Sequence, residues 1–490
     1  MNPRSGAKAT DSVRPVLKVE DMPAPAPPPG WAERSSAGRG DWLVASLFAL
    51  AGGLGAGLFA ARGGGGAELV LVSGACTGLV VAVVAATRFW AVVVALFVVR
   101  ASLDALKLGS FGNTTNAFDP SVVVGLAFLL SGSLWLFAQW RAGPWHRPSR
   151  TTMWFAALAA AGVFSAAGSE NPVQSGQVGL KICAGALMFA VLEQAYRHRP
   201  DRVRHVLAAG AASLVVPALV AIGQSQSSEV EQYIEVSRIR GTFVHANPFA
   251  TFLVILAVVA VAVRPHLRGG ARLAATAVMA TSSTLVLFTY ARGAWVALIL
   301  GLVVIGFKQD RRILVGLASL VIVVVIAVPS VTARLSDLSA ERVEGRGDPN
   351  SLAWRFGYWG RLLPEVAESP VTGIGLEQVL AHSEEGLQPH NVFVQTVVET
   401  GLLGLTCLVG LCVSMATELR RAMRRASPGL HRGVAIGAAA AAVGLFAQLL
   451  SENLLTQAAI HWYLAAPVAF AVALYGSPAR DDGAEALEAR

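Results

Sequence analysis

Three short motifs combine arginine, glycine and histidine in a chain that is otherwise strongly apolar. They are R-I-R-G-T-F (238–243), Y-A-R-G-A-W (290–295) and P-H-N (389–391). The arginine guanidinium is always charged and matches phosphate oxygens with a planar fork of donors, so arginine clusters favour anionic ligands. Histidine titrates near neutral pH and can take a proton from a hydroxyl nucleophile. An anion site beside a general base is the chemistry that these residue types indicate.

Four arginines are candidates for the anion site, namely Arg238, Arg240, Arg292 and Arg355. Anchoring to the phosphates of membrane lipids is the alternative role for any one of them. Two glycines stand beside arginines of this set, Gly241 and Gly293, and Asn247 closes the first motif. Glycine lets a backbone approach a ligand closely, so backbone amides could add donors to the guanidinium groups.

The third motif places His390 and Asn391 just before an apolar run. His390 is the candidate base, and a helix-capping or interfacial role is the alternative for it. Glu399 lies about two turns further along, where a carboxylate inside a membrane is costly and is usually paired or functional. Arg100 and Asp104 also fall in an apolar run, at a spacing of four residues that predicts a structural ion pair.

The composition is that of a membrane protein. Of the 490 residues, 54% are hydrophobic and only 14% are charged, and the apolar residues gather in long runs. The net charge of +8 does not indicate nucleic acid, because the basic residues sit in short clusters between those runs. The sequence predicts an all-α, polytopic membrane protein with about 14 transmembrane helices. The spans are 42–62, 69–87, 89–106, 120–140, 151–167, 178–196, 206–225, 248–263, 273–289, 293–307, 313–330, 393–415, 433–450 and 458–475.

Charge in the connecting loops predicts the orientation. Five loops are rich in Lys and Arg, whereas the alternate loops 168–177 and 451–457 contain neither; the basic loops are 141–150, 197–204, 264–272, 308–312 and 418–432. The positive-inside rule places the basic loops in the cytoplasm, and an even number of spans puts both termini there too. The candidate arginines and His390 then lie at the extracytoplasmic face of the inner or plasma membrane.

The predicted organisation has five parts. They are a Pro-rich flexible cytoplasmic tail (1–41), helices 1–11 (42–330), a large extracytoplasmic loop (331–392), helices 12–14 (393–475) and a cytoplasmic tail (476–490). Within the large loop, Leu352, Phe356, Trp359 and Leu363 recur at helical spacing. We expect an amphipathic helix there, lying on the outer membrane surface with its aromatic residues at the level of the lipid headgroups.

Several motifs of energy-coupled or hydrolytic enzymes are missing. The sequence contains no Walker A motif, no G-x-S-x-G, no H-E-x-x-H and no outward pair of aspartates with metal-ligand spacing. We therefore expect no bound metal and no cofactor. Without a nucleotide at the outer face, the substrate must carry its own activation, as a sugar on a lipid diphosphate does.

Five segments, taken in order, resemble the successive motifs of the O-antigen ligase and polymerase superfamily. They are R-I-R-G-T-F-V-H-A-N (238–247), Y-A-R-G-A-W (290–295), R-F-G-Y-W (355–359), S-P-V-T-G-I-G (369–375) and H-N-V-F-V-Q-T-V-V-E-T-G-L-L-G (390–404). The resemblance implies a metal-independent glycosyltransferase. Its donor would be a glycan on an undecaprenyl-diphosphate carrier, and its acceptor a hydroxyl of a glycan or a lipid-anchored molecule.

The resemblance also implies roles for the candidate residues. Arg238 and Arg292 would hold the diphosphate, with Arg240 and Arg355 in support, and His390 would deprotonate or position the acceptor. A polysaccharide polymerase is favoured over a ligase, although both need the same donor site. The alternative from another class is a transporter or flippase of lipid-linked glycans. Flippases need a charged central cavity and commonly contain internal repeats, whereas here the charges gather at the outer face and no repeat is found.

Overall fold

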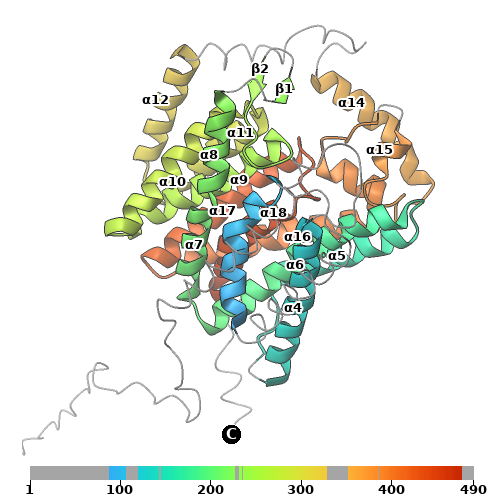
Figure 1. Cartoon of the computed structure of the whole chain (residues 1–490), viewed down its shortest axis with the longest axis horizontal. Coiled ribbons are helices and arrows are strands. Elements are labelled where there is room, and N and C mark those ends of the chain that lie inside the picture. The colour runs from blue at the N-terminus through green and yellow to red at the C-terminus, as the bar shows by residue number, and fades with distance from the viewer. Residues whose placement is uncertain are drawn as a thin grey trace, which may run out of the picture. The chain divides into compact units, whose positions relative to one another are not determined.

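The computed structural model describes residues 88–105, 120–142, 145–226, 231–233, 236–327, 351–383 and 386–476 (Figure 1). The proposed N-terminal tail and the first two predicted spans lie outside these residues. The described part is helical, apart from one antiparallel pair of three-residue strands, β1 (Glu231–Tyr233) and β2 (Val236–Arg238). These helices confirm the all-helical class predicted from the apolar runs. Helices are expected in such a chain because they satisfy the backbone hydrogen bonds within each apolar segment.

A helix is found at every predicted span from 89–106 onward. The first is helix 88–99 with η2 (Arg100–Ser102), followed by α4 (Pro120–Ala142), α5 (Arg150–Ala167), α6 (Pro172–His198), α7 (Arg202–Ser213), α8 (Val215–Ser225), α9 (Ala246–Val263), η3 (Arg264–His266), α10 (Gly269–Phe288), α11 (Arg292–Lys308), α12 (Arg312–Ala327), α14 (Ser351–Leu362), η4 (Leu363–Ala367), α15 (Val379–His382), α16 (Val392–Arg425), α17 (Leu430–Leu449) and α18 (Ala458–Tyr475). The pair α7 and α8 is nearly continuous and corresponds to one predicted span.

Seven helical segments of the described residues are long and apolar enough to cross a membrane. They are α6, the α7–α8 pair, α9, α10, α16, α17 and α18. The helices α11 and α12 are shorter, and α12 with its 16 residues falls just below the length that a straight span of a bilayer core needs. A multi-pass membrane protein is therefore supported, while the figure of fourteen spans stays a prediction.

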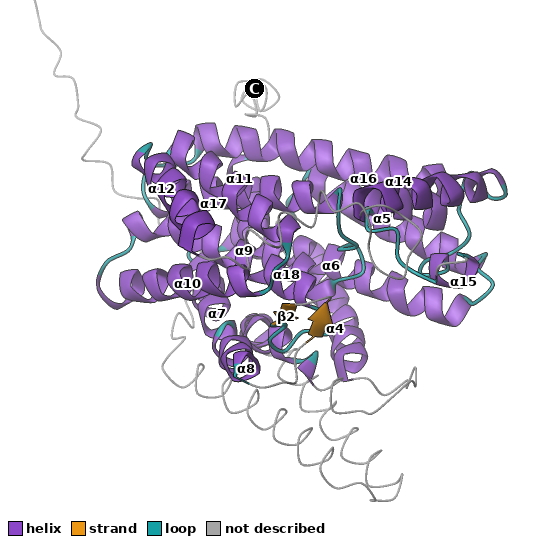
Figure 2. Cartoon of the chain, turned by 90° about the horizontal axis from the view of Figure 1, so that it is seen from above, coloured by secondary structure: helices purple, strands orange, loops and turns teal. Residues whose placement is uncertain are grey.

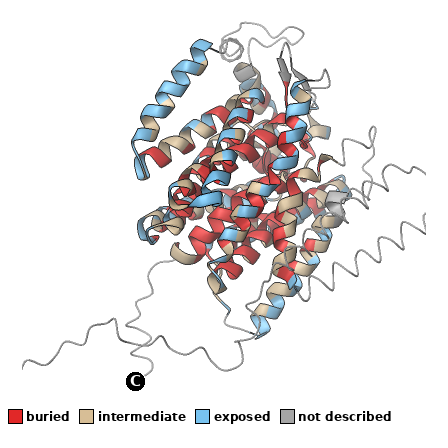
Figure 3. Cartoon of the chain, turned by 60° about the vertical axis from the view of Figure 1, so that its left-hand side comes forward, coloured by how far each residue is buried: buried red, intermediate tan, exposed pale blue. Residues whose placement is uncertain are grey.

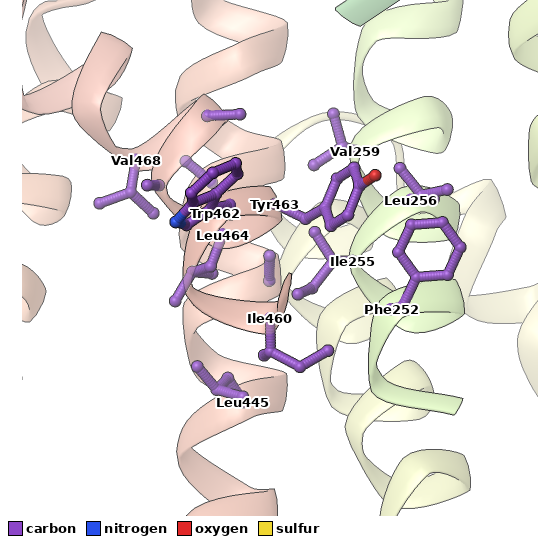
Figure 4. Packing of buried hydrophobic residues seen from close by; sticks show 14 of the residues in the cluster. Phe252, Ile255, Leu256, Val259, Leu445, Ile460, Trp462, Tyr463, Leu464 and Val468 are labelled. Carbon is purple, nitrogen blue, oxygen red and sulfur yellow. The ribbon is translucent and has the colours of Figure 1, made fainter. Parts of the chain in front are cut away.

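The core is formed by α9, α17 and α18, which pack on one another (Figure 4). Phe252 of α9 meets Tyr463 of α18 edge to face, with ring centroids 4.7 Å apart. Small residues of α17 allow close approach to its neighbours: a Cβ added at Gly437 would lie 3.1 Å from the Cα of Val259. This use of small residues is typical of helix packing in membranes, where van der Waals contact replaces the hydrophobic driving force.

The outer helices carry exposed apolar surface. No residue of α12 is buried, and its exposed side chains include Ile322 and Ile326 (Figure 3). Such a surface is unfavourable in water and suited to contact with lipid. The outer helices thus expose apolar side chains at positions where a soluble helical bundle would expose polar ones.

The helix α16, labelled in Figure 2, is the longest of the described helices. It is broken at Gly401, whose backbone has a φ of +66°. The segment 369–375 fills the break by backbone hydrogen bonds: Ile374 donates to the carbonyl of Val398 at 3.1 Å, and Leu402 donates to the carbonyl of Pro370 at 2.9 Å. A Cβ at Gly373 would lie 2.4 Å from the carbonyl carbon of Glu399, so glycine is required there. The first half of α16, which begins next to His390, is fixed by this pairing.

Candidate functional site

Arg238 is held at the end of β2 by a network that reaches three other elements. Its side chain is 6% exposed, and its Nε donates to the carbonyl of Thr289 at 2.8 Å. Its Nη2 donates to Oδ1 of Asn247 at 2.5 Å, and Nδ2 of Asn247 donates in turn to Oε2 of Glu452 at 2.6 Å. Asn247 lies in the first turn of α9, and Glu452 lies between α17 and α18. Arg238, Asn247 and Glu452 therefore form one hydrogen-bonded chain.

Arg292 enters the same place from the first position of α11. The turn before it is sharp, because Tyr290 adopts a left-handed backbone with φ of +49°. The next residue, Gly293, lies against the α17–α18 connection: a Cβ there would be 3.0 Å from Oγ of Ser451 and 3.8 Å from Oε1 of Glu452. The described neighbours of Gly293 are thus residues of this connection and of α17, and its predicted approach to a ligand stays a prediction.

Three arginines from three elements interact electrostatically with Glu452. They are Arg355 of α14, Arg238 and Arg292, and each of them stabilises the ionised carboxylate. Burial acts more strongly in the opposite direction, so the pKa of Glu452 rises to about 6. The cluster thus has three guanidinium groups around a single carboxylate that is only partly stabilised as an anion. A net positive charge remains at neutral pH, which favours an anionic ligand.

His390 is positioned by the neighbouring helix α14. The hydroxyl of Tyr358 donates to the carbonyl of Leu387 at 2.5 Å, and Nε1 of Trp359 donates to the carbonyl of Pro389 at 2.7 Å. The ring of Trp354 meets the His390 imidazole edge to face at 6.4 Å. His390 itself has a φ of +51°, an uncommon backbone for a residue with a side chain. Strain of this kind persists where surrounding contacts hold it, and it is common at functional sites.

The His390 imidazole is neutral at neutral pH. Burial lowers its pKa to about 4, and the positive charge of Arg355 acts in the same direction. A neutral imidazole is able to accept a proton, as a general base must. Arg355 also interacts with Glu452, so one guanidinium links the histidine to the arginine cluster. The structure therefore brings Arg238, Arg292, Arg355, Asn247 and His390 into one electrostatic neighbourhood.

Three of the predicted residues have structural tasks in the described part of the chain. Nη1 of Arg240 donates to the carbonyl of Val244, within its own loop. Gly241 has a φ of +56°, and a Cβ there would lie 3.0 Å from the carbonyl oxygen of Pro217, so it serves the fold rather than ligand approach. Asn391 caps α16, because its Oδ1 accepts from the amides of Phe393 and Val394.

Glu399 is completely buried inside α16, as predicted for a carboxylate in this span. Its Oε2 accepts a hydrogen bond from Nε2 of Gln395 at 3.2 Å, and its backbone carbonyl accepts from Ser165 and Gly375. These contacts belong to the break in α16 and join it to α5. Glu399 therefore supports the first half of the helix, and the described contacts do not link it to the arginine cluster.

The predicted amphipathic helix is present as α14, but it has two apolar faces. Phe356 and Leu363 are exposed, which leaves them available for the headgroup layer. Trp359 differs from the prediction, which placed it at the level of the headgroups. Its indole Nε1 donates to the carbonyl of Pro389. Tyr358 is fully buried. The helix therefore also packs on the segment that carries His390.

Sequence reasoning missed Glu452. The available signal was a carboxylate in the loop 451–457, which is free of Lys and Arg and which the charge pattern places at the outer face. The missing information was that this loop approaches the first turns of α9 and α11.

As for metals, the described residues contain no group of three or more His, Cys, Asp and Glu that could hold an ion. The predicted ion pair of Arg100 and Asp104 is confirmed, with Nη1 and Oδ1 3.4 Å apart.

Comparison with known families gives one match. Residues 277–409 match the family described as O-antigen ligase. The matched region contains Arg292, Arg355 and His390, while Arg238 and Glu452 lie on either side of it. No curated protein shows a significant match to the chain.

Proposed function

We propose that this chain is a membrane glycosyltransferase that acts on a lipid-linked glycan, as a member of the O-antigen ligase superfamily, and the match over residues 277–409 supports the proposal. The donor is a glycan on an undecaprenyl-diphosphate carrier, and the acceptor is a hydroxyl at the extracytoplasmic face of the membrane. Both termini lie in the cytoplasm. A polysaccharide polymerase is favoured over a ligase. The observation that supports the proposal most is the convergence of three arginines around Glu452, next to a neutral His390.

In the proposed reaction, the acceptor oxygen attacks the anomeric carbon of the donor sugar. The bond from that carbon to the diphosphate oxygen breaks, and the lipid diphosphate leaves with one more negative charge. His390 takes the proton of the acceptor hydroxyl and later releases it to water. Arg238, Arg292 and Arg355 stabilise the negative charge as it grows, which contributes more in the transition state than in the ground state.

The hydrogen-bonded network at Arg238 fits this role. Asn247 and Glu452 hold Arg238 in place before a ligand arrives, so little reorganisation is needed when the diphosphate binds. No step in the scheme requires a metal ion, since the guanidinium groups supply the positive charge. A transporter of lipid-linked glycans is the weaker candidate, because transport would not need a neutral imidazole held in a strained backbone beside the anion site.

The test measures donor binding and glycan transfer separately. We expect Arg238→Ala and Arg292→Ala each to reduce donor binding or transfer by about ten- to a hundredfold, which is the contribution of a charge-assisted hydrogen bond. Lysine at either position should restore only part of the activity, because it keeps the charge but lacks the bidentate fork. His390→Ala should abolish transfer and leave donor binding intact.

A matched control is Arg272→Ala, because Arg272 is an exposed arginine in a predicted cytoplasmic loop. It should have no effect on either measurement. Normal transfer by both arginine variants would make the cluster a lipid anchor and end the transferase proposal. Equal loss of donor binding in the histidine variant would move His390 from the acceptor to the diphosphate site.

A further inference from the structure

A cavity of about 210 Å³ lies beside the arginine cluster and has no part in the scheme above. Its wall is built from helix 88–105, α4, α6 and the starts of α9 and α18. The predicted topology puts the ends of these helices that face the cavity on the extracytoplasmic side. The cavity is therefore at the same membrane level as the candidate site.

One part of the cavity wall carries charge and hydrogen-bonding groups. Arg100 and Asp104 form their ion pair there, with side chains only 11% and 10% exposed. Lys181 and Gln177 of α6 add an ammonium and an amide, and Gln457 adds a second amide. Side chains of this kind are unfavourable next to lipid tails or in an empty apolar space. They fit a ligand that offers both hydrogen-bond donors and acceptors.

The rest of the wall is apolar. Leu126 and Leu129 of α4, Pro248 of α9 and Trp462 of α18 line it. A sugar ring has the same division, because its hydroxyl groups are polar and its C–H faces are not. The volume is below the roughly 300–1,000 Å³ of pockets that enclose drug-sized ligands, so it suits one ring rather than an oligosaccharide.

The cavity is connected to both halves of the proposed reaction. Pro248 directly follows Asn247, and Gln457 lies in the same connection as Glu452. Lys181 interacts electrostatically with Glu377, and Oε1 of Glu377 accepts from Nε2 of Gln388 at 2.9 Å. Gln388 is two residues before His390. The cavity thus adjoins the donor site, and Lys181 connects it through Glu377 and Gln388 to the segment that carries His390.

We propose that this cavity binds a sugar ring of the acceptor glycan and so selects which hydroxyl reaches His390. The inference rests on the proposed function and names a subsite for it. The acceptor is favoured over the donor diphosphate because the acidic and basic side chains in and beside the cavity balance. Arg100 is paired with Asp104, and Lys181 interacts with Glu377. A neutral ring with hydroxyl groups fits that balance, whereas the diphosphate fits the excess of arginine at Glu452.

Two substitutions alter the cavity by different means. Gly125→Met fills it: Gly125 lines the wall, and a Cβ there meets no atom within 4 Å, so the helix accepts the side chain. Methionine is also the better helix former, so folding should not suffer. Gln177→Ala removes a hydrogen-bonding group. The matched controls are Gly176→Met, where a Cβ also meets no atom within 4 Å, and Gln174→Ala, because neither residue lines the cavity.

The probe is the oligosaccharide repeat unit of the host glycan, released from its lipid and added to the full-length protein in nanodiscs. Its Kd is measured by saturation-transfer NMR, and binding of the undecaprenyl-diphosphate-linked donor is measured separately. We expect the Kd of the probe to rise roughly tenfold in Gln177→Ala, as for the loss of one or two hydrogen bonds. The Kd should rise at least as much in Gly125→Met, because its side chain occupies space that the ring needs. The controls should match the parent, and donor binding should not change.

Three results would overturn the inference: an unchanged Kd in both cavity variants, an equal loss of donor binding, or no binding of the probe to the parent chain. Failure of the proposed function is distinguishable, because it would appear as absent donor binding or transfer in the parent protein, whatever the probe does.

Discussion

The carboxyl group of Glu452 should make donor binding depend on pH. Its pKa is about 6, because burial raises the pKa and the surrounding arginines lower it. A diphosphate bound to the same arginines would place negative charge beside Glu452 and raise this pKa further. Binding of the donor should then be accompanied by uptake of a proton. Because the bound state holds the proton more tightly, affinity rises as pH falls from the pKa of the bound state to about 6, and it levels off below pH 6.

The magnitude follows from the starting pKa. At pH 7.5 the pH is about 1.5 units above the pKa of Glu452. Protonating the carboxylate on binding then costs about 2 kcal/mol, or roughly thirtyfold in affinity. At pH 5 the cost is close to zero. A diphosphate diester has no proton that titrates near neutral pH, so the donor itself should add little to this dependence.

The assay compares donor affinity at pH 5 and pH 7.5 for the parent and for Glu452→Gln. The amide of glutamine can still accept the hydrogen bond from Asn247, so the network should persist without the charge. We expect the parent to bind more weakly at pH 7.5 by up to thirtyfold, and the variant to bind tightly at both values. Glu368→Gln is the control, because Glu368 is an exposed carboxylate of the outer segment and is not among the groups that interact with Glu452, so the pH dependence of the parent should persist. A parent that binds equally at both values, or a variant that binds more weakly than the parent at pH 7.5, would refute the reasoning.

Four other outcomes are expected. Gly373→Ala should remove most of the folded protein, since its Cβ would lie 2.4 Å from the carbonyl carbon of Glu399, whereas Gly316→Ala, with open space around its Cβ, should leave thermal stability unchanged or higher. Tyr358→Phe should lower transfer by roughly fivefold without changing donor affinity, because the loss of its hydrogen bond to the carbonyl of Leu387, about 1 kcal/mol, loosens the segment that carries the base. Treatment with EDTA should leave transfer unchanged, and restoration by magnesium after such treatment would contradict the metal-independent scheme. Cysteine labelling from outside intact cells should reach position 345 and not position 425, and the reverse pattern would overturn the orientation.

The helices could be predicted from the sequence because apolar runs of this length have few alternatives to helix. The break in α16 could not, since V-V-E-T-G-L-L-G reads as a continuous span and glycine is common in such helices. The break depends on the backbone of residues 369–375, which pairs with it from a distance in sequence. Only the folded chain shows that Gly401 has a left-handed φ.

The site was predicted as a set of residue types rather than as a geometry. Arg238 and Arg240 are two residues apart in one motif, and both were assigned to the diphosphate. The chain turns at Gly241, and the described hydrogen bonds take Arg238 to Asn247 and Arg240 to Val244. Glu452 was missed for the complementary reason: it has no motif of its own, and its importance comes from the arginines that three other segments bring to it.

The joint between residues 369–375 and the broken α16 has a consequence for engineering. Its hydrogen bonds run from backbone to backbone, and tight approach is required at Gly373 and Gly401. Side chains such as Val371 and Leu402 are exposed there and do not form those bonds. The outer segment from α14 to residue 375 should therefore be exchangeable between relatives with different glycans, provided that both glycines are retained. A chimera of this kind should keep His390 in register if it also retains Tyr358 and Trp359, whose hydrogen bonds hold the residues just before it.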